Sequence, residues 1–77
     1  MSVRRTVILT AQDAVALIKE ERKRRGLQWA QLADMAQVSR TMLCNWAYGT
    51  RLPYLETALI VLHALGFDVI AERRKKD

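Results

Sequence analysis

Four side chains between positions 40 and 45 have the types and the spacing needed to read a nucleic acid. Arg40 and Thr41 are neighbours, and Cys44 and Asn45 follow one helical turn later. An arginine fork matches the O6 and N7 acceptors of guanine, an asparagine amide can pair with adenine, and a threonine methyl group can contact thymine. Because residues at this spacing share one face of a helix, the segment predicts a surface that contacts base edges.

The flanking residues predict two short helices joined by a turn, which would position this surface. From about Gln28 to Ala36, leucine and alanine residues fall on one face. Ser39 can cap a second helix that runs to about Tyr48 and turns Leu43 and Trp46 inward. This pattern is typical of a helix-turn-helix, whose second helix can enter the major groove of DNA.

Contacts to the DNA backbone should flank the base-reading face. Ser39, Thr50, Arg51 and the amides at the start of the first of these helices are natural candidates, and Arg22 is a weaker one. Trp29 either stacks against the backbone or packs inside the domain. The full set that we expect at the DNA backbone is Arg22, Gln28, Trp29, Ser39, Tyr48, Thr50 and Arg51.

Two further helices complete the predicted domain. Thr10 can cap a helix that runs to about Arg25, with Asp13 near its positive end and Gly26 suited to a left-handed C-terminal cap. The last helix covers about 54–65. Its predicted inner stripe is Leu55, Ala58, Leu59, Leu62 and Leu65.

Both ends of the chain are typical of extended segments. Val3–Leu9 is short, basic and rich in β-branched residues, so it forms an arm or an edge strand, and Arg4-Arg5 could enter a minor groove. Phe67–Arg73 alternates and reads as a strand that pairs with Val3–Leu9, with its copy in a second subunit, or with both. The predicted organisation is an arm at 1–9, a helix-turn-helix domain at 10–66, and a strand with a basic tail at 67–77.

Composition bounds the class of protein. The 77 residues suffice for one small domain whose core supplies only a few kcal/mol, so a second copy is the expected stabiliser. The 13 Lys and Arg residues against 8 Asp and Glu give a net charge of +5, which suits a nucleic-acid partner. Because Cys44 is the only cysteine, no disulfide can form within the chain, and no Cys/His cluster can hold a metal.

The sequence argues against a membrane protein and against an enzyme. No apolar run approaches the length of a membrane span, and Val7–Leu9 is too short for a signal-peptide core, so we expect a cytoplasmic protein. His63 has no paired nucleophile, so we expect neither enzymatic activity nor a cofactor.

From Ile18 to Phe67 the chain resembles the Xre-type, lambda-repressor-like helix-turn-helix family. The match runs without gaps over about two-thirds of the chain. It rests on Ile18, Arg22, Gly26-Leu27, Leu32-Ala33, Val38-Ser39, Leu43, Gly49, Pro53, Leu55-Glu56-Thr57 and Ala64-Leu65-Gly66. The resemblance implies an all-α fold of four to five helices with short β-strands at the termini. The flanking segments look like those of antitoxins that partner kinase-fold toxins, in which terminal strands join across a dimer.

Three positions depart from the family pattern. Gln37 stands in the turn where the family often has glycine, so it must accept a strained positive φ or alter the turn. Trp29 stands where the family often has a glutamine that touches phosphate. Ala47 replaces the acidic residue that usually pairs with the arginine of the first helix, which would leave Arg22 free for phosphate.

These observations predict a transcriptional repressor that binds double-stranded DNA as a homodimer on an inverted-repeat operator. An antitoxin that neutralises a protein toxin and autoregulates its operon is the alternative, and a helix-turn-helix used only for protein contacts is a third. The residues expected in the dimer interface are Ile60, Val61, Ala64, Phe67, Val69 and Ile70.

Overall fold

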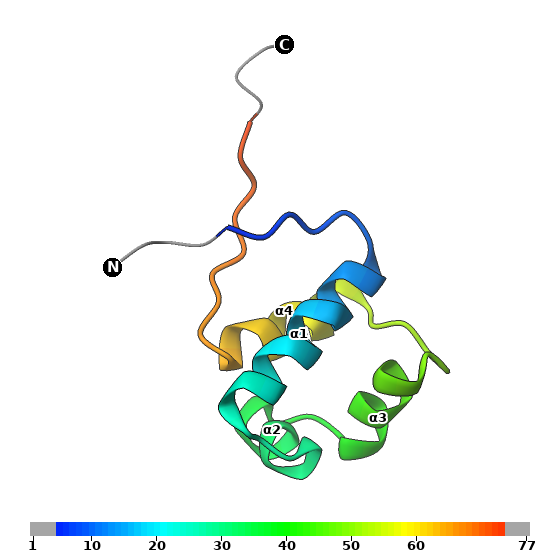
Figure 1. Cartoon of the computed structure of the whole chain (residues 1–77). Helices are drawn as coiled ribbons and strands as arrows, with labels where there is room; N and C mark the ends of the chain where they lie inside the picture. Colours follow the sequence, from blue (N-terminus) through cyan, green and yellow to red (C-terminus); the bar gives the residue numbers. More distant parts are fainter. Residues whose placement is uncertain (1–4, 74–77) are drawn as a thin grey trace.

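The computed structural model describes residues 5–73 and consists of four helices packed around one core (Figure 1). Helix α1 spans Ala11–Arg25, α2 spans Trp29–Ala36, α3 spans Arg40–Tyr48 and α4 spans Leu55–Ala64. No strand occurs within residues 5–73. The all-α class is therefore confirmed, with the lower of the two helix counts expected from the sequence.

Helix α1 begins and ends at the residues that the sequence indicated. The Thr10 hydroxyl accepts a hydrogen bond from the Asp13 amide at 3.1 Å, and the Asp13 carboxylate accepts one from the Thr10 amide at 3.1 Å. This reciprocal capping box satisfies two amides that the helix leaves unpaired. At the other end, Gly26 adopts a left-handed conformation that ends the helix.

The turn between α2 and α3 contains a residue in an unfavourable conformation. Gln37 has a φ of 58°, the only positive φ at a non-glycine position within residues 5–73. The conformation lets the Gln37 amide donate to the carbonyls of Ala33 and Asp34 and so end α2. The Ser39 hydroxyl then accepts from the Met42 amide at 3.3 Å and starts α3. Gln37 thus accepts the positive φ that this turn requires, at the cost of local strain.

Replacing Gln37 with glycine should stabilise the fold by about 1 kcal/mol. The left-handed conformation costs a residue with a Cβ about 1–2 kcal/mol, and the greater freedom of glycine in the unfolded chain offsets part of the gain. Urea unfolding measures the change. Ala16→Gly, at an exposed position inside α1, is the matched control and should lose about 1 kcal/mol. Equal losses in the two variants would show that Gln37 is not strained.

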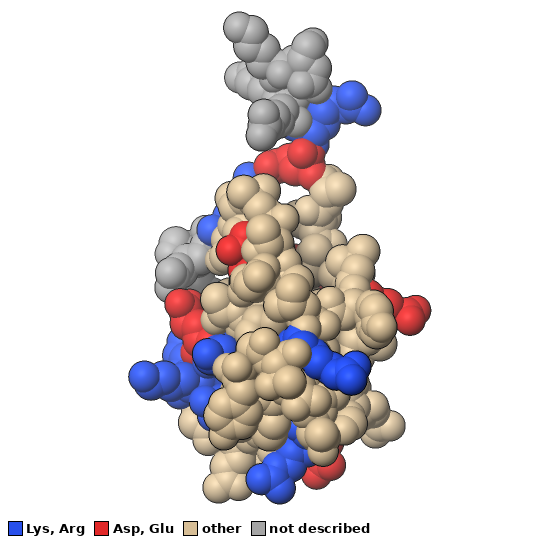
Figure 2. Space-filling view, turned by 90° about the vertical axis from the view of Figure 1, so that its right-hand side faces the viewer, with Lys and Arg blue, Asp and Glu red and all other residues tan. Residues whose placement is uncertain are grey.

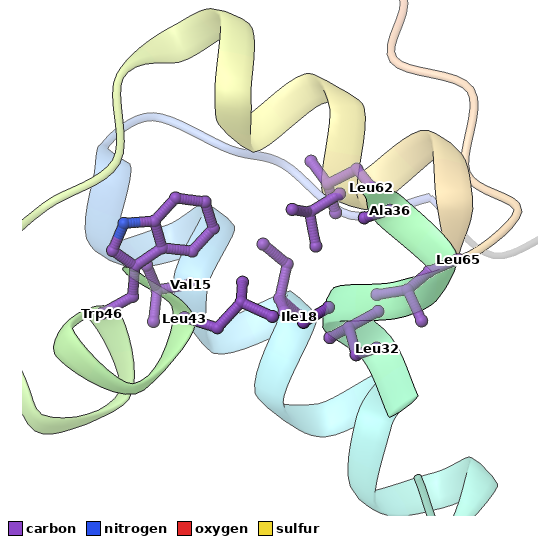
Figure 3. Packing of buried hydrophobic residues seen from close by; sticks show 10 residues of the cluster. Val15, Ile18, Leu32, Ala36, Leu43, Trp46, Leu62 and Leu65 are labelled. Atoms are coloured by element: carbon purple, nitrogen blue, oxygen red, sulfur yellow. The ribbon is translucent and has the colours of Figure 1, made fainter. Parts of the chain in front are cut away.

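The core is formed by apolar side chains from all four helices (Figure 3). Ile18 of α1, Leu32 of α2, Leu43 of α3 and Leu62 of α4 are almost completely buried. Trp46 extends the core under α3 and is only 5% exposed. Because the core holds α3 by its inner side, the outer side of this helix is presented at a fixed orientation.

The buried face of α4 differs from the one that the sequence pattern indicated. Val61 is 0% exposed and belongs to the core, so its expected place in a dimer interface is wrong. Leu55, expected inside, is 75% exposed, and Leu59 is only half-buried. The helix packs against both α1 and α2, and this rotates its buried stripe. The stripe is Ala58, Val61, Leu62 and Leu65.

The expected terminal strands are absent from the described residues. Residues 5–9 and 67–73 form no strand ladder with each other, in keeping with the marginal stability of an isolated pair of short strands in water. The two segments nevertheless approach each other, since Arg5 and Glu72 form an ion pair at 3.4 Å (Figure 1). Val3, Arg4 and the basic run from Arg74 to Lys76 lie outside the described residues.

A charged cluster joins the end of α1 to the end of α4. Glu21 accepts hydrogen bonds from Arg24 and Arg25. The bonds from Arg24 and then Arg25 lower the pKa of Glu21 from 4.5 to about 2. Arg25 also donates to the carbonyl of Leu65. This contact fixes the point where the chain leaves α4.

Acid should weaken the fold through Glu21. Because the pKa is lower in the folded state, the stabilisation is fully present above about pH 4.5 and is lost as the pH falls toward 2. Solvent screening of the exposed arginines limits the effect to about 1 kcal/mol. Urea unfolding of wild type and Glu21→Gln should therefore give a stability difference that shrinks between about pH 4.5 and pH 2. A stability difference that does not change with pH would show that protonation of Glu21 does not weaken the fold.

Candidate nucleic-acid interface

The outer side of α3 is accessible, as the sequence predicted. Arg40 and Thr41 are exposed, and Tyr48 is 84% exposed at the end of the helix. Cys44 and Asn45 are only half-buried. The inner side of α3 is held by the core, so these side chains lie on a surface whose orientation the fold determines.

A cavity of about 560 Å³ lies between α3 and the segment that precedes α4. Thr41 and Asn45 line one wall, and Arg51 and Tyr54 line another. Thr41 and Asn45 thus face the same hollow as an arginine that forms no ion pair within residues 5–73. Tyr54 is not among the site residues predicted from the sequence. Its place directly after Pro53, at the start of a helix, could have indicated an aromatic side chain on this surface.

The loop between α3 and α4 is tied to the end of α3. The Thr50 amide donates to the Asn45 carbonyl at 2.9 Å, and Gly49 adopts a positive φ of 77°. These bonds hold Arg51 beside the recognition surface of Thr41 and Asn45. The hydroxyl oxygen of Ser39 accepts the capping bond of α3, and its O–H can still donate to a phosphate.

A second cavity, of about 340 Å³, lies at the start of α2. Arg22, Gln28, Trp29 and Arg40 line it. Trp29 is half-buried, packs against the core and lies under the Arg22 guanidinium, whose central carbon is 4.3 Å from the ring centre. Trp29 therefore packs inside the domain, and one face of its ring holds the Arg22 guanidinium in a cation–π contact. Gln28 precedes the helix, and its amide donates to Gln31 at 2.7 Å.

The charges near these cavities are unbalanced. Within residues 5–73, the ion pairs join Glu21 to Arg24 and Arg25, and Arg5 to Glu72. Arg22, Arg40 and Arg51 therefore have no carboxylate partner in this range. Figure 2 faces the side that carries α3: the middle of this face is largely uncharged with a basic side chain on it, and both basic and acidic side chains lie toward its edges. Arginines that lack a carboxylate partner in this range suit a polyanion that runs across the surface.

Other kinds of site find no support within residues 5–73. No group of three or more histidine, cysteine or acidic side chains in this range could hold a metal ion. None of the described helices has the length and the apolar character that a bilayer crossing requires.

A family model described as helix-turn-helix matches residues 18–70. The match covers more than half of the chain and includes α2, α3 and α4 in full. The comparison with curated proteins found no match.

Proposed function

Because the chain belongs to the Xre-type, lambda-repressor-like helix-turn-helix family, whose members are DNA-binding domains rather than enzymes, we propose that it represses transcription by binding a specific DNA site. The observation that carries this proposal is the orientation of α3. Leu43 and Trp46 fix its inner side in the core, while Arg40 and Thr41 are exposed on its outer side. A helix held in this way can enter the major groove as one rigid unit.

Thr41 and Asn45 are the base readers in this proposal, with Cys44 between them. The asparagine amide can pair with adenine, and the threonine methyl can contact thymine. Arg51, across the same cavity, provides a phosphate contact, as do the exposed Thr50 and Tyr48. Phosphate contacts of this kind set the position of the helix, while the base contacts set the sequence preference.

We place the dimer interface on the outer side of α4 and the segment that follows it. Ile60, Val69 and Ile70 are large apolar residues that remain exposed in the single chain. Ala64 and Phe67 lie half-buried between them in the sequence. A two-fold axis beside these residues would place two α3 helices on successive turns of one DNA face, which matches an inverted-repeat operator.

Val69→Asp should weaken the dimer by more than about tenfold, because the variant places an unpaired charge in a desolvated interface. Analytical ultracentrifugation measures the shift toward monomer. Gln12→Asp adds the same charge at an exposed position of α1 and should leave the dimer intact. An unchanged mass for Val69→Asp would remove the 67–73 segment from the interface.

Selection of bound sites from random duplexes tests the proposed function directly. We expect an enriched inverted repeat with half-sites about one helical turn, roughly 10 base pairs, apart. Binding should weaken steeply with salt, because phosphate contacts release counterions. A protein that enriches no sequence and binds every duplex weakly would refute specific recognition, and one that binds no duplex would favour a helix-turn-helix used only for protein contacts.

An antitoxin role is the alternative function, and the N-terminal segment is the feature that favours it. Val7 and Leu9 are strongly exposed in the single chain, so a protein partner could cover them. An adjacent reading frame for a larger kinase-like protein that co-purifies with this chain would support the alternative. A divergent phage promoter beside the gene would favour the plain repressor.

A further inference from the structure

Arg22 and Arg40 come from different helices and line the same cavity at the start of α2. Neither guanidinium forms an ion pair with a carboxylate of residues 5–73. Two like charges that share a cavity repel each other, and an anion placed between them removes this repulsion. The cavity therefore favours an anionic ligand.

The contacts of Arg22 leave part of its hydrogen-bonding capacity unused. Its Nη1 donates to the Leu27 carbonyl at 2.8 Å, and its guanidinium lies 4.3 Å from the centre of the Trp29 ring. Its Nε is buried and has no hydrogen-bond partner among the described residues. An unsatisfied buried donor is costly, but solvent does not reach this nitrogen. A ligand must therefore bind Arg22 through its other guanidinium nitrogens.

We propose that Arg22 and Arg40 together bind one DNA phosphate, and that Trp29 positions Arg22 through the face of its ring. Guanidinium groups match phosphate oxygens with paired hydrogen bonds. The inference rests on the proposed function and deepens it. Arg40 becomes a phosphate ligand rather than the guanine reader that the sequence indicated, and the bases are read by Thr41 and Asn45 in the other cavity.

A scan with uncharged backbone linkages tests the shared phosphate. Each phosphate of the selected duplex is replaced in turn by a neutral methylphosphonate, and binding of wild type, Arg22→Gln and Arg40→Gln is compared. Both variants should become less sensitive to replacement at the same single position, because the arginine that remains still contacts that phosphate, while both keep the wild-type response at the position lost by Arg51→Gln. Reduced sensitivity at two different positions, or a changed base preference in Arg40→Gln with an unchanged scan, would overturn the inference.

Salt dependence gives a second measure, which needs no specific sequence. Each neutralised phosphate contributes a slope of about 0.9 in the logarithm of affinity against the logarithm of salt concentration. For the double variant Arg22→Gln/Arg40→Gln this slope should therefore be smaller by about 0.9. If the two arginines contacted separate phosphates, it would be smaller by about 1.8. Because random duplexes suffice, this result stands even if no operator is selected. Wild-type binding that lacks any salt dependence would instead refute the proposed function.

Variants of Trp29 separate positioning from packing. Trp29→Phe keeps an aromatic face under Arg22 and should bind like wild type at the shared phosphate. Trp29→Leu keeps apolar bulk against the core but offers no π face, so it should reproduce the scan of Arg22→Gln while thermal unfolding shows that the domain remains folded. Equal binding by the leucine and phenylalanine variants would show that the Trp29 ring has no positioning role.

Discussion

Trp46→Ala should lower the free energy of unfolding by about 3–5 kcal/mol. The indole is 5% exposed and belongs to the core cluster (Figure 3), so truncation would leave a cavity in the core. Domains of this size are stable by only about 5 kcal/mol, so the variant should be largely unfolded at 37 °C. Urea unfolding followed by circular dichroism measures the loss.

Tyr48→Ala is the matched control for Trp46. It removes an aromatic side chain from the same helix, but one that is 84% exposed, so stability should change by less than about 0.5 kcal/mol. Similar losses at the two positions would mean that α3 is not anchored through its inner side.

Asn45→Ala should weaken binding to the selected operator by about 1–3 kcal/mol and relax the preference for one base pair in each half-site. The variant removes the amide that faces the cavity beside Thr41, while the backbone carbonyl of residue 45 still accepts from Thr50. Competition binding against operators changed at single base pairs measures both effects.

Arg51→Ala gives the contrasting result in the same assay. Loss of a residue that contacts only phosphate should weaken binding to all duplexes alike. It should also reduce the salt dependence of binding by the contribution of about one phosphate contact. If Asn45→Ala behaved in this way instead, Asn45 would be a backbone contact. If Arg51→Ala weakened only the operator, Arg51 would be a base reader.

Features set by short-range chemistry were predictable from the sequence. Thr10 with Asp13, Ser39, Gly26 and Gly49 begin or end helices where their side chains or backbone freedom require, because a cap depends on a few neighbouring residues. The inward position of Trp46 followed from helical periodicity alone. The exposed side of α3 followed from the same reasoning.

Features that depend on how elements pack were not predictable in this way. Helix α4 is apolar on several sides, so periodicity could not decide whether Leu55 or Val61 would be buried; its contacts with α1 and α2 decided it. Strand formation at 67–73 depends on a partner rather than on the local sequence. Likewise, Arg22 and Arg40 are far apart in the sequence, and only the fold brings them to one cavity.

The bond from Arg25 to the Leu65 carbonyl has a consequence for operator geometry. It fastens the chain at Leu65, just before the proposed dimer segment, to the helix that carries Arg22. If the dimer forms as proposed, this bond limits how far the two DNA-binding surfaces can rotate relative to each other. Each base pair turns the duplex by about 34°. One extra base pair between the half-sites should therefore rotate the second half-site away from the α3 helix of the second subunit.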